Sequence, residues 1–201
     1  ATIFNTSIEE NYDLVKDIYS QIEPFKKRKA GKLSGGMKQK LALSCALIHR
    51  PVVLFLDEPT TGVDAVSRKE FWEMLKRLKE QGITILVSTP YMDEAGLCDR
   101  VALMQEGKLL SVGTPQEITG AFKHTIRAVK SENMFQLLKD IKAFPGAQDC
   151  YSFGEYHHVI MKEDYDKEKL KQYLEQKGHK QVEVKETEPN IEDCFMQLMK
   201  N

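Results

Sequence analysis

The chain has 201 residues, of which 41% are hydrophobic and 29% are charged. These proportions are ordinary for a folded protein and exclude disorder of the whole chain. The 29 basic and 30 acidic side chains leave a formal net charge of −1, which counts against nucleic acid as the main partner. The four cysteines form no C-x-x-C pair, and we expect them to be reduced, as in a cytosolic protein. The start ATIFNTSIEENY does not read as a signal peptide, and no apolar run reaches the roughly 20 residues of a spanning helix.

The first half of the chain predicts helices that alternate with two short apolar strands. Apolar residues recur at helical spacing in three segments, and glycine or proline ends each of them. The two strands are continuous apolar runs, which is typical of parallel strands that are buried on both faces. The expected helices cover residues 8–22, 35–50 and 64–81, and the expected strands cover residues 52–56 and 83–87.

The second half predicts a hairpin and then a small α+β domain. The hairpin strands are 101–104 and 108–112, and Thr114-Pro115-Gln116-Glu117 has the pattern of a helix capping box. The order strand, helix, strand, strand, helix, strand then indicates a split βαβ unit, with a border near Gly120. Its expected elements are strand 124–129, helix 132–142, strands 148–153 and 157–162, helix 166–177, strand 180–186 and helix 190–200.

A hydroxyl and two glycines open the helix that starts at Gly35. The segment reads Leu33-Ser34-Gly35-Gly36-Met37-Lys38-Gln39. Free N–H groups at a helix start, the helix dipole and the close approach that glycine allows together favour an anion such as phosphate. Taken alone, the same residues are also compatible with an ordinary serine N-cap.

Two carboxylates, Asp57 and Glu58, follow the first apolar strand in the segment 52–64, VVLFLDEPTTGVD. The carboxyl ends of strands are where open α/β sheets bind ligands. One carboxylate can serve Mg²⁺, and its neighbour can orient or deprotonate an attacking water. A lone D-E pair after a strand is otherwise a solvated turn.

The two segments together resemble the ATP-binding cassette (ABC) ATPases, over about residues 9–119. The resemblance implies an α/β fold, an ABC-type P-loop NTPase parallel sheet with helices, followed by the small α+β split βαβ accessory domain. The sheet is expected to be incomplete, because no G-x-x-x-x-G-K-[ST] string occurs in the 201 residues. The implied borders are 1–30 for the end of the helical subdomain, 31–121 for the ATPase segment and 122–201 for the accessory domain. We therefore expect a C-terminal piece of a longer cassette.

The resemblance also implies a role for each motif residue. Leu33, Ser34, Gly35, Gly36, Met37 and Gln39 match the signature loop, which in this family contacts ATP held by the opposite cassette. Asp57 matches the carboxylate that serves Mg²⁺, and Glu58 matches the catalytic carboxylate. Asp64 matches an acid that crosses the dimer interface, and it is also placed to cap the following helix.

Pro90 stands where most members of the family have a switch histidine after the second strand. Proline offers neither a polar side chain nor a backbone N–H. The string around it, STPYMDEA, is similar to the first cassette of proteins that carry two cassettes in one chain. We expect the site that contains Pro90 to bind ATP and to hydrolyse it slowly.

The expected function is to bind and hydrolyse MgATP at a cassette–cassette interface and so drive export through an integral membrane permease. The expected cofactors are ATP and Mg²⁺. The expected partners are a second cassette and the permease, and no nucleic-acid partner is expected. The expected location is the cytoplasmic face of the membrane. Residues 1–201 alone are expected to be inactive. The alternatives are a soluble ABC ATPase that acts on ribosomes or nucleic acid, and a unit that serves only folding or interaction.

Overall fold

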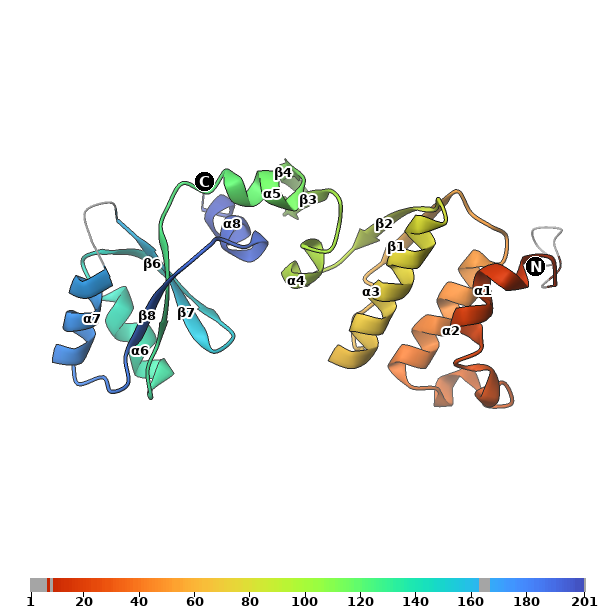
Figure 1. Cartoon of the computed structure of the whole chain (residues 1–201), viewed down its shortest axis with the longest axis horizontal. Coiled ribbons are helices and arrows are strands. Elements are labelled where there is room, and N and C mark those ends of the chain that lie inside the picture. Colours follow the sequence, from red (N-terminus) through yellow and green to blue (C-terminus); the bar gives the residue numbers. More distant parts are fainter. Residues whose placement is uncertain (1–6, 8, 163–166, 201) are drawn as a thin grey trace. The chain divides into compact units, whose positions relative to one another are not determined.

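The computed structural model describes residues 7, 9–162 and 167–200 and divides into two compact units, Ala1–Leu97 and Cys98–Asn201 (Figure 1). Each unit has its own hydrophobic core and is treated separately. Among the described residues, no helix combines the length and the apolar character that crossing a bilayer requires.

Among its described residues, the first unit contains three helices longer than one turn and two parallel strands. Its elements are the 3₁₀ turns η2 (Glu9–Asn11), η3 (Glu23–Phe25) and η4 (Ala30–Lys32), the helices α1 (Tyr12–Tyr19), α2 (Gly35–Leu47), α3 (Ala65–Glu80) and α4 (Met92–Ala95), and the strands β1 (Val53–Asp57) and β2 (Thr84–Ser88). β1 and β2 pair in parallel from Val53 opposite Thr84 to Asp57 opposite Ser88. The helices and strands expected from the sequence are present among the described residues, with ends that differ by a few residues. Residue 8, the expected start of the first helix, lies outside the described residues.

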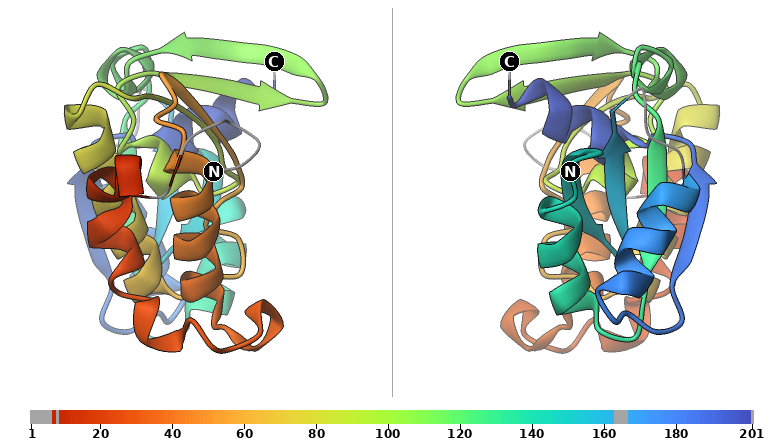
Figure 2. Two further views of the ribbon diagram at one scale, coloured as in Figure 1. Left: turned by 90° about the vertical axis from the view of Figure 1, so that its right-hand side faces the viewer. Right: turned by 90° about the vertical axis from the view of Figure 1, so that its left-hand side faces the viewer.

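The core of the first unit lies between the helices and one face of β1. Leu43 and Leu47 of α2 and Phe71 and Met74 of α3 are buried there, together with Leu54 of β1. Figure 2 (left) shows α1 and α2 side by side on this unit. Because residues at 3.6 spacing share one helix face, the buried apolar residues of α1, α2 and α3 lie on one face of each helix.

The expectation that both strands are buried on both faces is wrong for this structure. Val53 and Phe55 of β1 are 43% and 72% exposed, and Leu86 of β2 is 60% exposed. Successive side chains of a strand point to opposite faces, so Leu54 faces the core while Val53 and Phe55 face away from it. The helices cover one face of the pair, and the continuous apolar run does not reveal that.

The second unit contains a hairpin, a four-stranded antiparallel sheet and four helices among its described residues. The hairpin is β3 (Val101–Gln105) with β4 (Lys108–Gly113), and the sheet has the order β6 (Ala147–Phe153), β7 (Tyr156–Met161), β5 (Ile126–Lys130), β8 (Glu183–Thr187). The helices are α5 (Pro115–Gly120), α6 (Met134–Lys142), α7 (Lys167–Gln176) and α8 (Ile191–Leu198). The predicted order of strands and helices in the split βαβ unit is confirmed.

Helices cover both faces of this sheet. α6 and α7 lie on the same side of it (Figure 2, right), and their Leu137, Leu170 and Leu174 are fully buried against Val129 and Val159. α8 reaches the sheet through a buried polar pair, in which Asp193 Oδ1 lies 2.9 Å from His158 Nδ1.

The hairpin and α5 belong to the second compact unit. α5 contacts α8, and the Cys194 thiol donates to the Ile118 carbonyl oxygen at 3.6 Å. The contacts therefore divide the chain after Leu97, whereas the family resemblance divides it at residues 121 and 122. The division by resemblance stays a prediction about subdomains.

The predicted capping box is confirmed. The Thr114 hydroxyl accepts from the Glu117 N–H at 3.1 Å, and the Glu117 carboxylate accepts from the Thr114 N–H at 2.7 Å. These bonds, the Thr114 N–H first, lower the pKa of the Glu117 carboxyl. α8 has a second box, in which Asn190 Oδ1 accepts from the Asp193 N–H at 2.9 Å and Asp193 Oδ2 accepts from the Asn190 N–H at 3.0 Å.

We predict that Asp193→Ala destabilises the second unit by roughly 2–4 kcal/mol, since it removes half of a capping box and leaves the buried His158 imidazole without its partner. Urea unfolding of the whole chain, followed by a probe in the second unit, measures the change. Glu175→Ala on the exposed face of α7 is the control and should alter the free energy of unfolding by less than about 0.5 kcal/mol. Equal effects of the two changes would contradict the importance of the Asp193–His158 pair.

Candidate functional site

The two predicted motifs meet in the first unit. A Cβ added to Gly35 would lie 3.0 Å from the Gly62 carbonyl oxygen, and one added to Gly36 would lie 2.8 Å from the Ser67 Oγ. The first distance is tighter than nine in ten real Cβ contacts, and the second is shorter than real Cβ contacts allow. Glycine therefore favours close packing of the start of α2 against the loop and helix start that follow β1.

Ser34 is the N-cap of α2. Its hydroxyl accepts a hydrogen bond from the Met37 N–H at 3.3 Å, and the residue is exposed. The serine N-cap read from the sequence is therefore confirmed. This bond satisfies one of the N–H groups that every helix start leaves without an intrahelical partner, and the dipole at this end still favours an anion.

Four residues of the signature segment are at least partly buried. Leu33, Met37 and Gln39 are half-buried, and Gln39 lies one turn into α2, where it lines a narrow crevice with Pro59 and Thr60. These residues connect the helix start to the interior of the unit. The exposed residues of the segment are Ser34, Gly35 and Lys38.

Asp57 and Glu58 stand at the carboxyl end of β1 and are held by the end of β2. The Ser88 hydroxyl donates to Asp57 Oδ1 at 2.5 Å. The Glu58 N–H donates to both the carbonyl oxygen and the hydroxyl of Ser88, each at 3.0 Å. Both carboxylates are exposed. The structure thus brings the two predicted acids together at the edge where the parallel strands end.

The backbone of Glu58 is in the left-handed region, with φ at +43°. A residue other than glycine in this region carries strain on the order of 1 kcal/mol and persists where its surroundings fix it. Here the Thr61 N–H donates to the Glu58 carbonyl oxygen, and the Thr61 hydroxyl donates to Glu58 Oε2, both at 3.1 Å. The conformation and the carboxylate of Glu58 are therefore fixed by the turn that follows it.

Asp64 caps α3, as expected. Its Oδ1 accepts from the Ser67 N–H at 3.0 Å, and bonds from Ser67, that N–H first, lower the pKa of its carboxyl. The side chain is an exposed anion at the start of the helix that meets Gly36.

Pro90 lies on the exposed segment between β2 and α4. Its neighbours are fixed, because the Tyr91 N–H donates to the Thr89 hydroxyl at 3.1 Å and that hydroxyl donates to Glu94 Oε2 at 2.6 Å. His49 is the one histidine in the sequence of the first unit. It follows α2 and precedes the amino end of β1, whereas Pro90 follows the carboxyl end of β2, so His49 is no substitute.

The site also contains a buried acid that the sequence analysis did not assign. Glu94 of α4 is 2% exposed and binds Thr60, Thr89 and Arg68. Thr60 and Thr89 each follow a strand predicted to be parallel to the other, so their meeting at one edge was accessible from the sequence. The sequence does not reveal that Glu94, and not the adjacent Asp93, is the acid that binds these two threonines.

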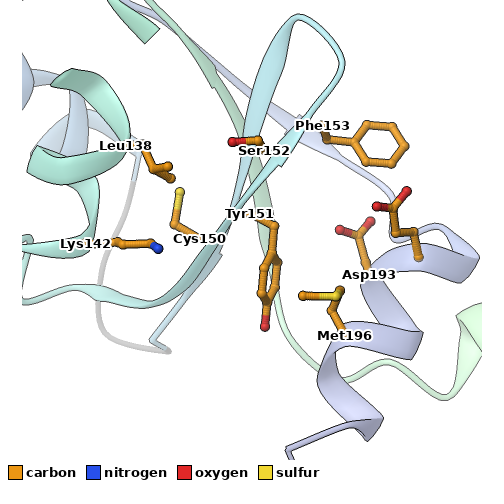
Figure 3. A pocket seen from close by; sticks show the side chains of 9 residues that line it. Leu138, Lys142, Cys150, Tyr151, Ser152, Phe153, Asp193 and Met196 are labelled. Carbon is orange, nitrogen blue, oxygen red and sulfur yellow. The ribbon is translucent and has the colours of Figure 1, made fainter. Parts of the chain in front are cut away.

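A pocket of about 280 Å³ lies in the second unit beside β6, between α6 and α8 (Figure 3). Tyr151, Phe153 and Met196 line it with Cys150, whose thiol pKa is raised to about 12 by burial. Its Asp193 already pairs with His158. No residue predicted for the site lines this pocket, and the candidate chemistry stays in the first unit.

Comparison with known proteins gives consistent results. A family model described as "ABC transporter" matches residues 5–61, which include the signature segment and both carboxylates. The probable multidrug ABC transporter ATP-binding protein YbhF of Escherichia coli is 39% identical over 183 residues, covering 90% of this chain and 31% of YbhF. The Nod factor export ATP-binding protein I of Burkholderia lata is 34% identical over 199 residues, covering 97% of this chain and 63% of that protein.

Two further proteins extend the comparison. The doxorubicin resistance ATP-binding protein DrrA of Mycobacterium tuberculosis is 36% identical over 142 residues, covering 70% of this chain and 41% of DrrA. The solved structure of CbiO1 from Clostridium perfringens, part of an ABC transporter complex, is 33% identical and covers 58% of this chain and 48% of its own, with a TM-score of 0.49.

The chain spans between 31% and 63% of the length of the three relatives compared by sequence. All three are named as ATP-binding proteins of multidrug transport, export or drug resistance. With the signature segment and the paired carboxylates in the order found here, the chain is similar over most of its length to ATP-binding proteins of ABC transporters.

Proposed function

We propose that this chain is part of an ATP-binding subunit that hydrolyses MgATP between two cassettes and so drives export through a membrane permease. The observation that supports this most is the position of two adjacent exposed acids at the carboxyl end of parallel strands, where the Asp57 carboxylate accepts from the Ser88 hydroxyl and the Glu58 N–H donates to Ser88. The export names of the relatives and the net charge of −1 favour transport over action on ribosomes or nucleic acid.

The carboxylates are suited to a hard cation and to water. Mg²⁺ is bound in proteins by one or two carboxylates together with substrate phosphates, so a larger ligand cluster is not needed. In the proposal Asp57 serves this ion, which supplies charge neutralisation on the phosphate oxygens. Glu58, held by Thr61 and by its strained backbone, orients the attacking water and accepts its proton.

The exposed Ser34 and the start of α2 are proposed to face the nucleotide of a second cassette. Ser34, Gly35 and Gly36 would present N–H groups to the terminal phosphate, with Leu33, Met37 and Gln39 holding the segment in place. Asp64 would lie at the same cassette–cassette interface. The second cassette is either another copy of the protein or a second cassette in the same chain, and the subunit would sit on the cytoplasmic face of the membrane through the permease.

We predict that Glu58→Gln in the full-length protein lowers kcat for ATP hydrolysis by about 10²-fold or more, since the amide cannot accept the proton. ATP affinity should stay within about threefold, because binding of the phosphates does not need this proton acceptor. Phosphate release and equilibrium nucleotide binding measure the two quantities. Glu73→Gln on the exposed surface of α3 is the matched control and should have no effect. Hydrolysis that survives Glu58→Gln unchanged would refute the proposed mechanism.

Ser34→Arg should abolish nucleotide trapping in the opposite cassette and spare trapping in its own, because the long side chain would fill the anion site at the start of α2. Photolabelling with an azido nucleotide, followed by separation of the two cassettes, measures trapping in each. Loss confined to the cassette that contains Ser34 would show that the segment serves its own site.

The site that contains Pro90 should hydrolyse ATP about 10²–10³-fold more slowly than a site with a histidine there, because one hydrogen-bonding group on the terminal phosphate is missing. Single-turnover hydrolysis by the full-length protein should therefore have two phases. Equal rates at the two sites of the unmutated protein would contradict the asymmetry.

A further inference from the structure

Glu94 is a buried carboxylate that joins three separate segments of the first unit. Its Oε2 accepts hydrogen bonds from the Thr60 hydroxyl at 3.0 Å and from the Thr89 hydroxyl at 2.6 Å. Its Oε1 accepts from Arg68 Nε at 3.1 Å. Thr60 lies in the loop after β1, Thr89 in the segment after β2, and Arg68 in α3.

Each partner of Glu94 is close to a residue of the candidate site. Thr60 is fully buried and stands two residues after Glu58. Thr89 is adjacent to Pro90. Arg68 also binds Asp93 at 2.9 Å and lies over the Tyr91 ring at 4.2 Å, so it fixes the segment on the other side of Pro90. Glu94 thus holds both loops that leave the parallel strands.

Burying a carboxylate costs more free energy than burying an apolar side chain of the same size. Removing a charge from water costs several kcal/mol, and an apolar side chain in a well-packed site is often as stabilising as a buried ion pair. Hydrogen bonds to a carboxylate are directional, so the three bonds fix the positions of the Thr60 and Thr89 hydroxyls and of the Arg68 guanidinium. Apolar packing alone would not fix these groups. The arrangement is therefore better suited to setting geometry than to adding stability.

Glu58 is the residue whose position must be fixed for the proposed chemistry. Its backbone is strained at a φ of +43° and is held on one side by Ser88. On the other side, the turn to Thr61 and Gly62 passes through Thr60, whose hydroxyl is fixed by Glu94. Without that anchor, the turn that fixes Glu58 through the two Thr61 bonds loses one of its attachments to the interior of the unit.

We propose that Glu94 is a positioning residue for Glu58, acting through Thr60, and that it couples the loop after β1 to the segment that carries Pro90. The inference rests on the proposed function, in which Glu58 handles the attacking water. A displacement of about 1 Å of a group that positions a reacting water is enough to cost about 10²-fold in rate.

Kinetics of the full-length protein provide the first test. Glu94→Ala should lower kcat for ATP hydrolysis by about 10–100-fold while ATP affinity changes by less than about threefold. Glu94→Gln should recover most of the rate, because its carbonyl oxygen can accept from Arg68 and its amide can donate to the two threonine hydroxyls. Glu70→Ala is the matched control, since it removes the 2.7 Å ion pair with Lys40 in the same unit without touching either loop. A rate for Glu94→Ala equal to that of the control overturns the proposal.

A double-mutant cycle separates positioning from general weakening. If Glu94 acts through Glu58, then Glu94→Ala should cause no further loss of rate in the Glu58→Gln background. Full additivity of the two changes overturns the proposal. If Glu58→Gln itself leaves hydrolysis intact, it is the proposed function that fails, and the positioning of the loop is then decided by the next measurement.

Amide hydrogen exchange in nucleotide-free protein tests positioning without reference to catalysis. The Thr61 and Val63 N–H groups donate to the Glu58 and Thr60 carbonyl oxygens at 3.1 and 3.2 Å. Their exchange should be about tenfold or more faster in Glu94→Ala and unchanged in Glu70→Ala. If Glu94→Ala does not fold, Thr60→Val removes one of the three bonds at nearly constant volume and should show the same pattern. Unchanged exchange in the folded variant overturns the proposal.

Discussion

The parallel pairing of β1 with β2 is the constraint on which the candidate site depends. Because the strands run in the same direction and pair up to Asp57 opposite Ser88, the two segments that follow them start at one edge. The Glu58 N–H extends this pairing by one more bond to the Ser88 carbonyl oxygen. Glu58 and Ser88, which lie 30 positions apart in the sequence, become neighbours through this pairing.

The start of α3 connects that edge to the signature segment. Asp64 caps α3, and Ser67 in its first turn both donates to Asp64 and meets the backbone of Gly36. A side chain on Gly36 would collide with the Ser67 side chain of α3. The start of α2, which is proposed to face a phosphate, therefore packs against the same helix start that follows the acids after β1.

Local signals made most of the elements predictable. Helix ends are marked by bonds and conformations within about four residues, as at Asp64, Gly82 and the Thr114 capping box. The helix expected at residues 64–81 accordingly runs from 65 to 80. The exposure of Phe55 was not predictable, since burial of a strand face depends on what packs there and not on the apolar run itself. The role of Glu94 was hidden for the same reason: of two adjacent acids, the buried one is selected by Thr60, 34 residues away.

The shape of the loop around Pro90 and its chemistry are set by different residues. The shape comes from the Tyr91 N–H bond to Thr89, the Thr89 bond to Glu94 and the Arg68 guanidinium on the Tyr91 ring. None of these contacts uses the side chain at position 90. The support of the loop therefore does not depend on whether proline or histidine stands at position 90. In the proposed function, a site with proline there would keep the groups proposed to bind MgATP and would lack one donor to the phosphate, so it would be expected to hold ATP while hydrolysing it slowly.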